Sequence, residues 1–93
     1  MAPDTQACRF HIQTGGEVQA LVRIVALFAQ RDLPITDLIM FPHPGGSSLM
    51  LTASDMSRQQ AEIVAAKIGN ILSVRAVDLT LADGVPIRLS AAA

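Results

Sequence analysis

Four segments of the chain carry the apolar pattern of β-strands. In the first, residues 8–13, Cys8, Phe10 and Ile12 lie on one side and polar residues on the other, which is the alternation of a half-buried strand. The second is apolar at nearly every position, and the third and fourth alternate. These three cover residues 35–41, 47–53 and 74–81. A run of turn-forming residues joins the second strand to the third and predicts a hairpin.

The first helix is predicted from Val18 onward. Thr14 and Glu17 stand just before it with the spacing of a capping box, in which each side chain bonds the backbone amide of the other residue. Pro34 ends the helix, because it disfavours helical geometry at the residue before it. The apolar stripe of this helix is wider than one contact with a sheet needs. Its helically spaced positions are 18, 21, 22, 25, 28 and 29, and it is widened by Ala20, Ile24 and Leu27.

A second helix is predicted after Ser57, which repeats the capping-box spacing with Gln60. The order strand, helix, strand, strand, helix, strand predicts an α+β, ferredoxin-like βαββαβ fold, in which a four-stranded antiparallel sheet carries both helices on one face. We expect residues 1–7 to form a short N-terminal lead-in, 8–82 the single domain, and 83–93 a tail without a firm element. The apolar stripe predicted for the second helix comprises Ala61, Val64, Ala65, Ile68 and Leu72.

Composition narrows the classes of function. The chain has 93 residues, of which 51% are apolar and 16% charged, and this indicates one folded domain. A net charge of −1 and 3% aromatic residues provide neither the basic surface nor the stacking side chains that nucleic acids or anionic membranes require. Polar residues interrupt each apolar stretch before the ~20 residues that span a bilayer. Cys8 is the one cysteine, so an internal disulfide is excluded and the redox compartment is left open. A reducing cytosol is the default, and we expect a cytoplasmic protein.

The sequence indicates no metal, cofactor or catalytic group. Cys8 and His11 are three apart on a strand, so their side chains fall on opposite faces, and His43 is isolated in a turn. The acidic residues are scattered, and no pair has a spacing that predicts a shared pocket. Two known uses of this fold are disfavoured. An acylphosphatase needs an arginine in the loop after the first strand, and an RNA-binding sheet needs exposed aromatics on its first and third strands.

Gly15 and Gly16 are the candidate binding feature that the residues themselves offer. They stand at the predicted N-terminus of the first helix, where free amides and the positive end of the helix dipole can hold an anion. The absence of side chains would let a ligand approach the backbone. The other interpretation is a tight turn between strand and helix, which glycines also favour. The residues alone leave both interpretations open.

Several segments together resemble a known family. Residues 21–31 read Leu-Val-Arg-Ile-Val-Ala-Leu-Phe-Ala-Gln-Arg and lead into Ile-Thr-Asp-Leu at 35–38, and similar matches occur at 70–74 and 77–80. In this order and spacing the chain resembles the ACT domain, specifically that of the small regulatory subunit of acetolactate (acetohydroxyacid) synthase. The resemblance implies a non-catalytic module that forms dimers. In the family, an amino acid effector binds where the loop after the first strand meets the neighbouring copy.

Positions for two sites follow from the apolar pattern, the glycines and the resemblance together. The predicted ligand-binding residues are Gly15, Gly16, Glu17 and Ile35, and the predicted dimer interface comprises Ala20, Ile24, Leu27 and Ile39. The chain departs from the family at the effector contacts. The family's Asn-x-Pro-Gly loop aligns with Gly16, Val18 and Gln19, and a second family asparagine aligns with Pro34. Both asparagine contacts are therefore missing here.

Two hypotheses of function follow. The first is a homodimeric regulatory subunit of an acetolactate-synthase-type enzyme in branched-chain amino acid biosynthesis, whose partner is the catalytic subunit. The second is a stand-alone dimeric sensor that binds an amino acid or another small ligand. Neither hypothesis includes catalytic activity of the chain itself, and neither requires a nucleic acid, a membrane, a metal or a cofactor.

Overall fold

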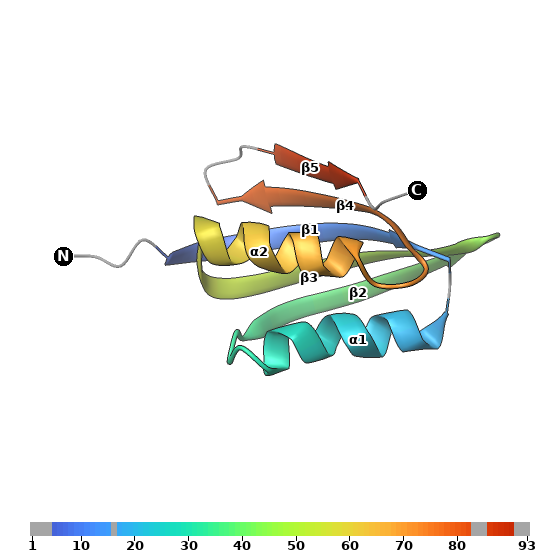
Figure 1. Cartoon of the computed structure of the whole chain (residues 1–93), viewed down its shortest axis with the longest axis horizontal. Helices are drawn as coiled ribbons and strands as arrows, with labels where there is room; N and C mark the ends of the chain where they lie inside the picture. The colour runs from blue at the N-terminus through green and yellow to red at the C-terminus, as the bar shows by residue number, and fades with distance from the viewer. Residues whose placement is uncertain (1–4, 16, 83–85, 91–93) are drawn as a thin grey trace.

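Seven elements succeed one another in the computed structural model, which describes residues 5–15, 17–82 and 86–90. Their first six members have the predicted βαββαβ order (Figure 1). Residues 1–4, 83–85 and 91–93 of the expected lead-in and tail lie outside the described residues. The elements are β1 (Thr5–Thr14), α1 (Val18–Ala29), β2 (Ile35–His43), β3 (Gly46–Ser57), α2 (Arg58–Gly69), β4 (Val74–Leu81) and β5 (Pro86–Ser90).

The strands form one antiparallel sheet in the order β2-β3-β1-β4-β5. Its first four members are the predicted four-stranded sheet, and this confirms the ferredoxin-like fold. β5 was not expected, because residues 83–93 were predicted to lack a firm element. It pairs with β4, from Ala76 opposite Ser90 to Thr80 opposite Pro86. A proline is tolerated as the first residue of an edge strand, since its missing amide breaks no bond within the sheet.

β1 is a central strand, with β3 on one side and β4 on the other. It begins at Thr5, three residues before the predicted start, and its register against β3 shifts between Gln6 and Cys8. Beyond this bulge the predicted alternation is confirmed, because Cys8, Phe10 and Ile12 are buried while the residues between them are not. The helices cover the buried side of the sheet and leave the other face open.

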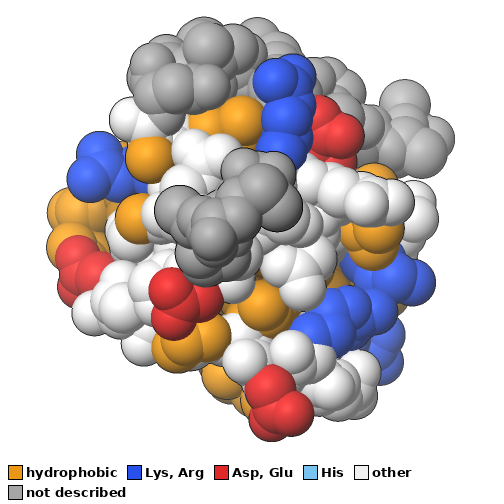
Figure 2. Space-filling model, turned by 90° about the vertical axis from the view of Figure 1, so that its left-hand side faces the viewer, with side chains coloured by type: hydrophobic (Ala, Val, Ile, Leu, Met, Phe, Trp, Pro, Cys, Tyr) orange, Lys and Arg blue, Asp and Glu red, His pale blue; other side chains and the backbone are white. Residues whose placement is uncertain are grey.

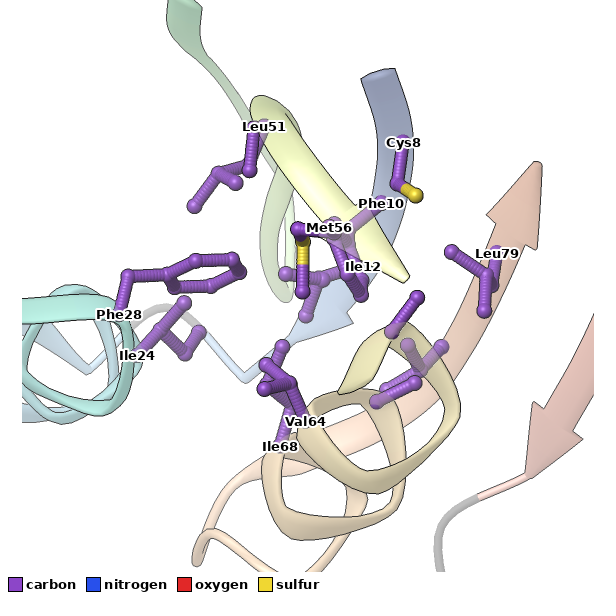
Figure 3. Packing of buried hydrophobic residues seen from close by; sticks show 14 of the residues in the cluster. Cys8, Phe10, Ile12, Ile24, Phe28, Leu51, Met56, Val64, Ile68 and Leu79 are labelled. Atoms are coloured by element: carbon purple, nitrogen blue, oxygen red, sulfur yellow. The ribbon is translucent and has the colours of Figure 1, made fainter. Parts of the chain in front are cut away.

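The core lies between this buried face and the two helices (Figure 3). Phe28 from α1 meets Phe10 from β1 edge to face, with ring centroids 5.3 Å apart. Val64 and Ile68 of α2 point into the same cluster. The predicted α2 stripe is confirmed except at Leu72, which is 78% exposed. Leu72 lies beyond the end of α2 at Gly69 and so is not held in the helical phase.

The two predicted capping boxes have different outcomes. In α2 the Ser57 hydroxyl accepts a bond from the Gln60 amide, and the Gln60 side chain accepts one from the Ser57 amide, as predicted. In α1 the prediction is wrong. Thr14 still belongs to β1, and its hydroxyl donates to the Ser47 carbonyl on β3. Glu17 is itself the N-cap residue and makes no side-chain cap, so the first amides of α1 lack a capping side chain.

α1 presents a different face to the sheet from the one its spacing predicted. Its buried residues are Ala20, Ile24 and Phe28, whereas Val18 is 76% and Val22 62% exposed. A ridge of every fourth residue therefore faces the core, and part of the predicted stripe faces solvent. The helix is apolar on two faces, so its periodicity alone did not determine which one packs inward.

Charges of both signs are interspersed on the end of the molecule that Figure 2 shows. The view has no large area of one sign, as expected from the net charge of −1. None of the helices in the described residues is both long and apolar enough to cross a membrane.

Candidate functional site

A cavity of about 300 Å³ opens between the first half of α1 and the hairpin formed by β2 and β3. It lies at the end of the molecule where α1 begins, on the right in Figure 1. Its size is at the lower end of the range for small-molecule sites. The lining residues are Thr14, Glu17, Val18, Leu21, Met40, Pro42, Ser47 and Leu49.

The floor of the cavity depends on a close approach between β1 and β3. Thr14, the last residue of β1, pairs with Ser47 at the start of β3. Beside this pair, Gly46 lies so close to the Thr14 carbonyl oxygen that a Cβ atom at position 46 would overlap it. Glycine is therefore required there by space. The hairpin can then continue from His43 through a tight turn, in which Gly45 has a φ of +86°.

The walls are mainly aliphatic, and the polar groups are few. Thr14 and Ser47 are the buried polar residues, with 4% and 7% exposure. The Ser47 carbonyl accepts from the Thr14 hydroxyl at 3.5 Å, whereas the Ser47 hydroxyl makes no hydrogen bond to another described residue and is not fully buried. The carboxylate of Glu17 stands at the exposed mouth. Such a site can enclose a small apolar body and bond one polar end of it.

The predicted ligand-binding residues do not all meet here. Glu17 lines the cavity, and Gly16 lies outside the described residues. The Gly15 amide is already used, because it donates to the Ser73 carbonyl at 2.8 Å and to the Ser73 hydroxyl at 3.1 Å. It is not free for an anion, and the turn interpretation holds for this residue. Ile35 pairs with Ala53, six residues along β3 from the cavity floor.

Sequence reasoning missed most of the lining. Leu21, Met40 and Leu49 belong to three different elements, and each was interpreted as an ordinary apolar position. Only the register between β1 and β3 brings Ser47 beside Thr14. The pair of glycines at the hairpin turn is the signal in the sequence that could have indicated a close approach at this point.

Comparison with models of known protein families assigns the chain to a family. Residues 2–85 match the family model described as ACT-like domain. The chain belongs to the ACT-like domain family. No match was found among curated proteins or among solved structures. Membership in this family indicates a regulatory domain that binds a small ligand, and the cavity beside α1 is a place in the described residues where such a ligand would be enclosed.

The interface residues predicted for this ACT-like domain lie in two environments. Ala20 and Ile24 are in the core of the monomer, so their side chains are not a surface for a second copy. They widen the apolar stripe of α1, and they form its inward part. Leu27 is partly buried against the same core. Ile39 is 43% exposed on β2 and remains a candidate.

The cysteine and histidine side chains of the ACT-like domain do not line the cavity. No cluster of three or more His, Cys, Asp or Glu residues occurs in the part that the structure describes. Cys8 is buried, and burial raises the pKa of its thiol, which favours the unreactive protonated form. The ring of His11 contacts the Gln13 side chain, and that of His43 contacts the Pro44 carbonyl.

Proposed function

We propose that this ACT-like domain is a non-catalytic regulatory subunit that pairs with a second copy of itself through β2. One observation carries the proposal. Every residue of β2 after Ile35 is exposed, including Leu38, Ile39, Met40 and Phe41. β2 is also an edge strand whose outer backbone groups are unpaired in the sheet. An edge that is long, apolar and unpaired favours pairing with another chain.

The exposed face of α1 supports the same partner. Val18 and Val22 are apolar and largely exposed, and Val18 lines the same cavity as Met40 of β2. A second copy that extends the sheet across β2 would also be placed to cover these two side chains.

The double substitution Leu38→Lys and Ile39→Lys is expected to convert a dimer into a folded monomer. Two lysines on the free edge would repel their counterparts and be desolvated on pairing. Analytical ultracentrifugation at micromolar concentration measures the mass, and circular dichroism checks that the fold is kept. Leu72→Lys is the matched control, because Leu72 is exposed but lies outside the sheet, between α2 and β4, and this variant should stay dimeric. A monomeric parent chain would contradict the proposal.

We further propose that the regulated partner is the catalytic subunit of an acetolactate-synthase-type enzyme. Support comes from the sequence similarity over residues 21–38 and from membership in a regulatory family. Co-purification of the tagged chain from its native cells, followed by mass spectrometry, tests this. A thiamine-dependent catalytic subunit should be recovered in stoichiometric amount. Recovery of a different enzyme, or of none, would contradict this partner and leave the dimer proposal intact.

A stand-alone sensor is the second candidate, because the cavity beside α1 is enclosed within one chain and needs no partner protein. A sensor must be stabilised by its ligand when no other protein is present. A thermal-shift screen of amino acids and related small molecules on the purified chain distinguishes the two candidates. A stabilising ligand favours the sensor, and stabilisation only by the catalytic subunit favours the regulatory subunit.

A further inference from the structure

The chemistry of the cavity beside α1 restricts what it can hold. We infer that it binds a small aliphatic molecule whose polar end is an amine or a hydroxyl, and that it discriminates against carboxylates. The inference rests on the proposed small-ligand function of the domain and specifies its ligand class. It is carried by three observations: the apolar walls, the hydroxyl of Ser47, and the sign of the charge at the mouth.

The walls favour a compact aliphatic body. Leu21, Met40 and Leu49 approach the cavity from a helix and two strands, and Val18 and Pro42 complete the apolar lining. The volume of about 300 Å³ holds one small molecule rather than an extended one. Met40 is 49% and Val18 76% exposed. A bound aliphatic group would remove part of this surface from water, which is favourable in proportion to its area.

Ser47 supplies a polar contact in the wall of the cavity. The residue is 7% exposed and lines the cavity, and its hydroxyl makes no hydrogen bond to another described residue. No side-chain nitrogen or oxygen of the described residues is both fully buried and unpartnered, so this hydroxyl keeps contact with water, and a ligand group that bonds it replaces that water with a modest gain in affinity. The hydroxyl can accept from an amine or exchange a bond with a ligand hydroxyl. By contrast, the Ser48 hydroxyl is already used, since it donates to Gln13 at 2.8 Å.

Glu17 sets the sign of the charge at the mouth. It is the exposed N-cap residue of α1 and the one charged side chain among the described residues that line the cavity. The uncapped helix terminus carries the equivalent of about half a positive charge, whereas the carboxylate carries a full negative one. Arg75 lies near Gly15 but does not line the cavity. A ligand carboxylate would therefore meet a like charge, and an ammonium group an opposite one.

Three probes with one aliphatic body test the inference: cyclohexylmethanamine, cyclohexylmethanol and cyclohexanecarboxylate. Each is titrated into the isotopically labelled chain at neutral pH, and amide shifts are followed by NMR. The amine and the alcohol should shift the amides of Leu21, Met40 and Ser47 in a saturable way, with the amine binding more tightly. The carboxylate should bind at least tenfold more weakly than the amine. Equal binding of the carboxylate, or shifts confined to residues outside the cavity, would overturn the inference.

Two substitutions separate the polar contributions. Ser47→Ala should weaken both the amine and the alcohol by about three- to tenfold, the usual effect of one hydrogen bond. Ser48→Ala is the matched control and should leave both affinities unchanged, because that hydroxyl is bonded to Gln13. Glu17→Gln should weaken the amine by about two- to fivefold, as expected for an exposed ion pair, and spare the alcohol. An unchanged affinity in Ser47→Ala would overturn the role of the hydroxyl.

Failure of the ligand inference can be distinguished from failure of the proposed regulatory dimer. If the chain is dimeric but none of the three probes reaches the cavity at millimolar concentration, the ligand inference fails while the regulatory dimer stands. If the chain is monomeric yet binds the amine at the cavity, the dimer proposal fails and the ligand class stands. Thermal melting of each variant without probe shows whether it is folded. The titration of the parent chain decides the inference even if Ser47→Ala does not fold.

Discussion

Replacement of Phe28 by alanine is expected to lower the free energy of unfolding by about 3 to 5 kcal/mol, the range for truncating a buried phenylalanine. Phe28 is fully buried and packs edge to face on Phe10, with an angle of 83° between the rings. It is the largest side chain by which α1 is anchored to the sheet. Since a domain of this kind is stable by only ~5 to 15 kcal/mol, the loss would be a large fraction of the total. Urea denaturation measures it.

Val22→Ala is the control for Phe28→Ala. Val22 lies on the same helix but is 62% exposed, so its truncation should change the stability of the monomer by less than about 0.5 kcal/mol. Because the cavity needs α1 in place, Phe28→Ala should also abolish the amide shifts that the amine probe causes at Leu21. A Phe28→Ala chain as stable as Val22→Ala would show that α1 is not anchored through the two rings.

The second large effect is expected at Gly46. A Cβ atom there would overlap the Thr14 carbonyl oxygen, and the neighbour is backbone, so the strands must separate to admit it. We expect Gly46→Ala to cost about 1 to 3 kcal/mol, the range for overpacking. The substitution also moves Ser47 away from Thr14 and should reduce binding at the cavity. Thermal melting and the probe titration measure the two effects.

The adjacent glycine provides the comparison. Gly45 has a φ of +86° but nothing within 4 Å of the place where a Cβ would stand. Asparagine tolerates positive φ better than most residues, so Gly45→Asn should change stability by no more than about 0.5 kcal/mol. If Gly45→Asn were the more destabilising of the two, the requirement for glycine would be one of turn conformation and not of space at Gly46.

The sheet could be predicted because strand burial follows a period of two. Phe10 and Ile12 are buried on the side that their alternation indicated, and the βαββαβ order then leaves one familiar arrangement. α1 was predicted with the wrong face inward, because a helix that is apolar on two sides carries no signal for which one meets the sheet. β5 was missed because five residues that begin with proline give too short a pattern.

Of the candidate site, only the charged residue at the mouth of the cavity could be predicted. Glu17 was identified from its place at the start of α1, and it does line the cavity. Ser47 could not be identified, because only the register between β1 and β3 places it beside Thr14 at the cavity. Gly15 was predicted to offer its amide, yet Ser73 takes that amide. A contact between residues 58 positions apart has no trace in a local pattern.

The two edge strands of the sheet, β2 and β5, differ in length and composition, and this limits how many copies of the chain can join. β2 offers nine residues, most of them apolar, whereas β5 has five, begins with Pro86 and includes Arg88. Short length, proline and charge are the features that keep a strand edge from recruiting neighbours. If β2 pairs with β2 of another copy, both β2 edges are paired, and the free edges of the dimer are the two β5 strands, which do not favour further pairing. Growth then stops at two chains instead of continuing into a filament.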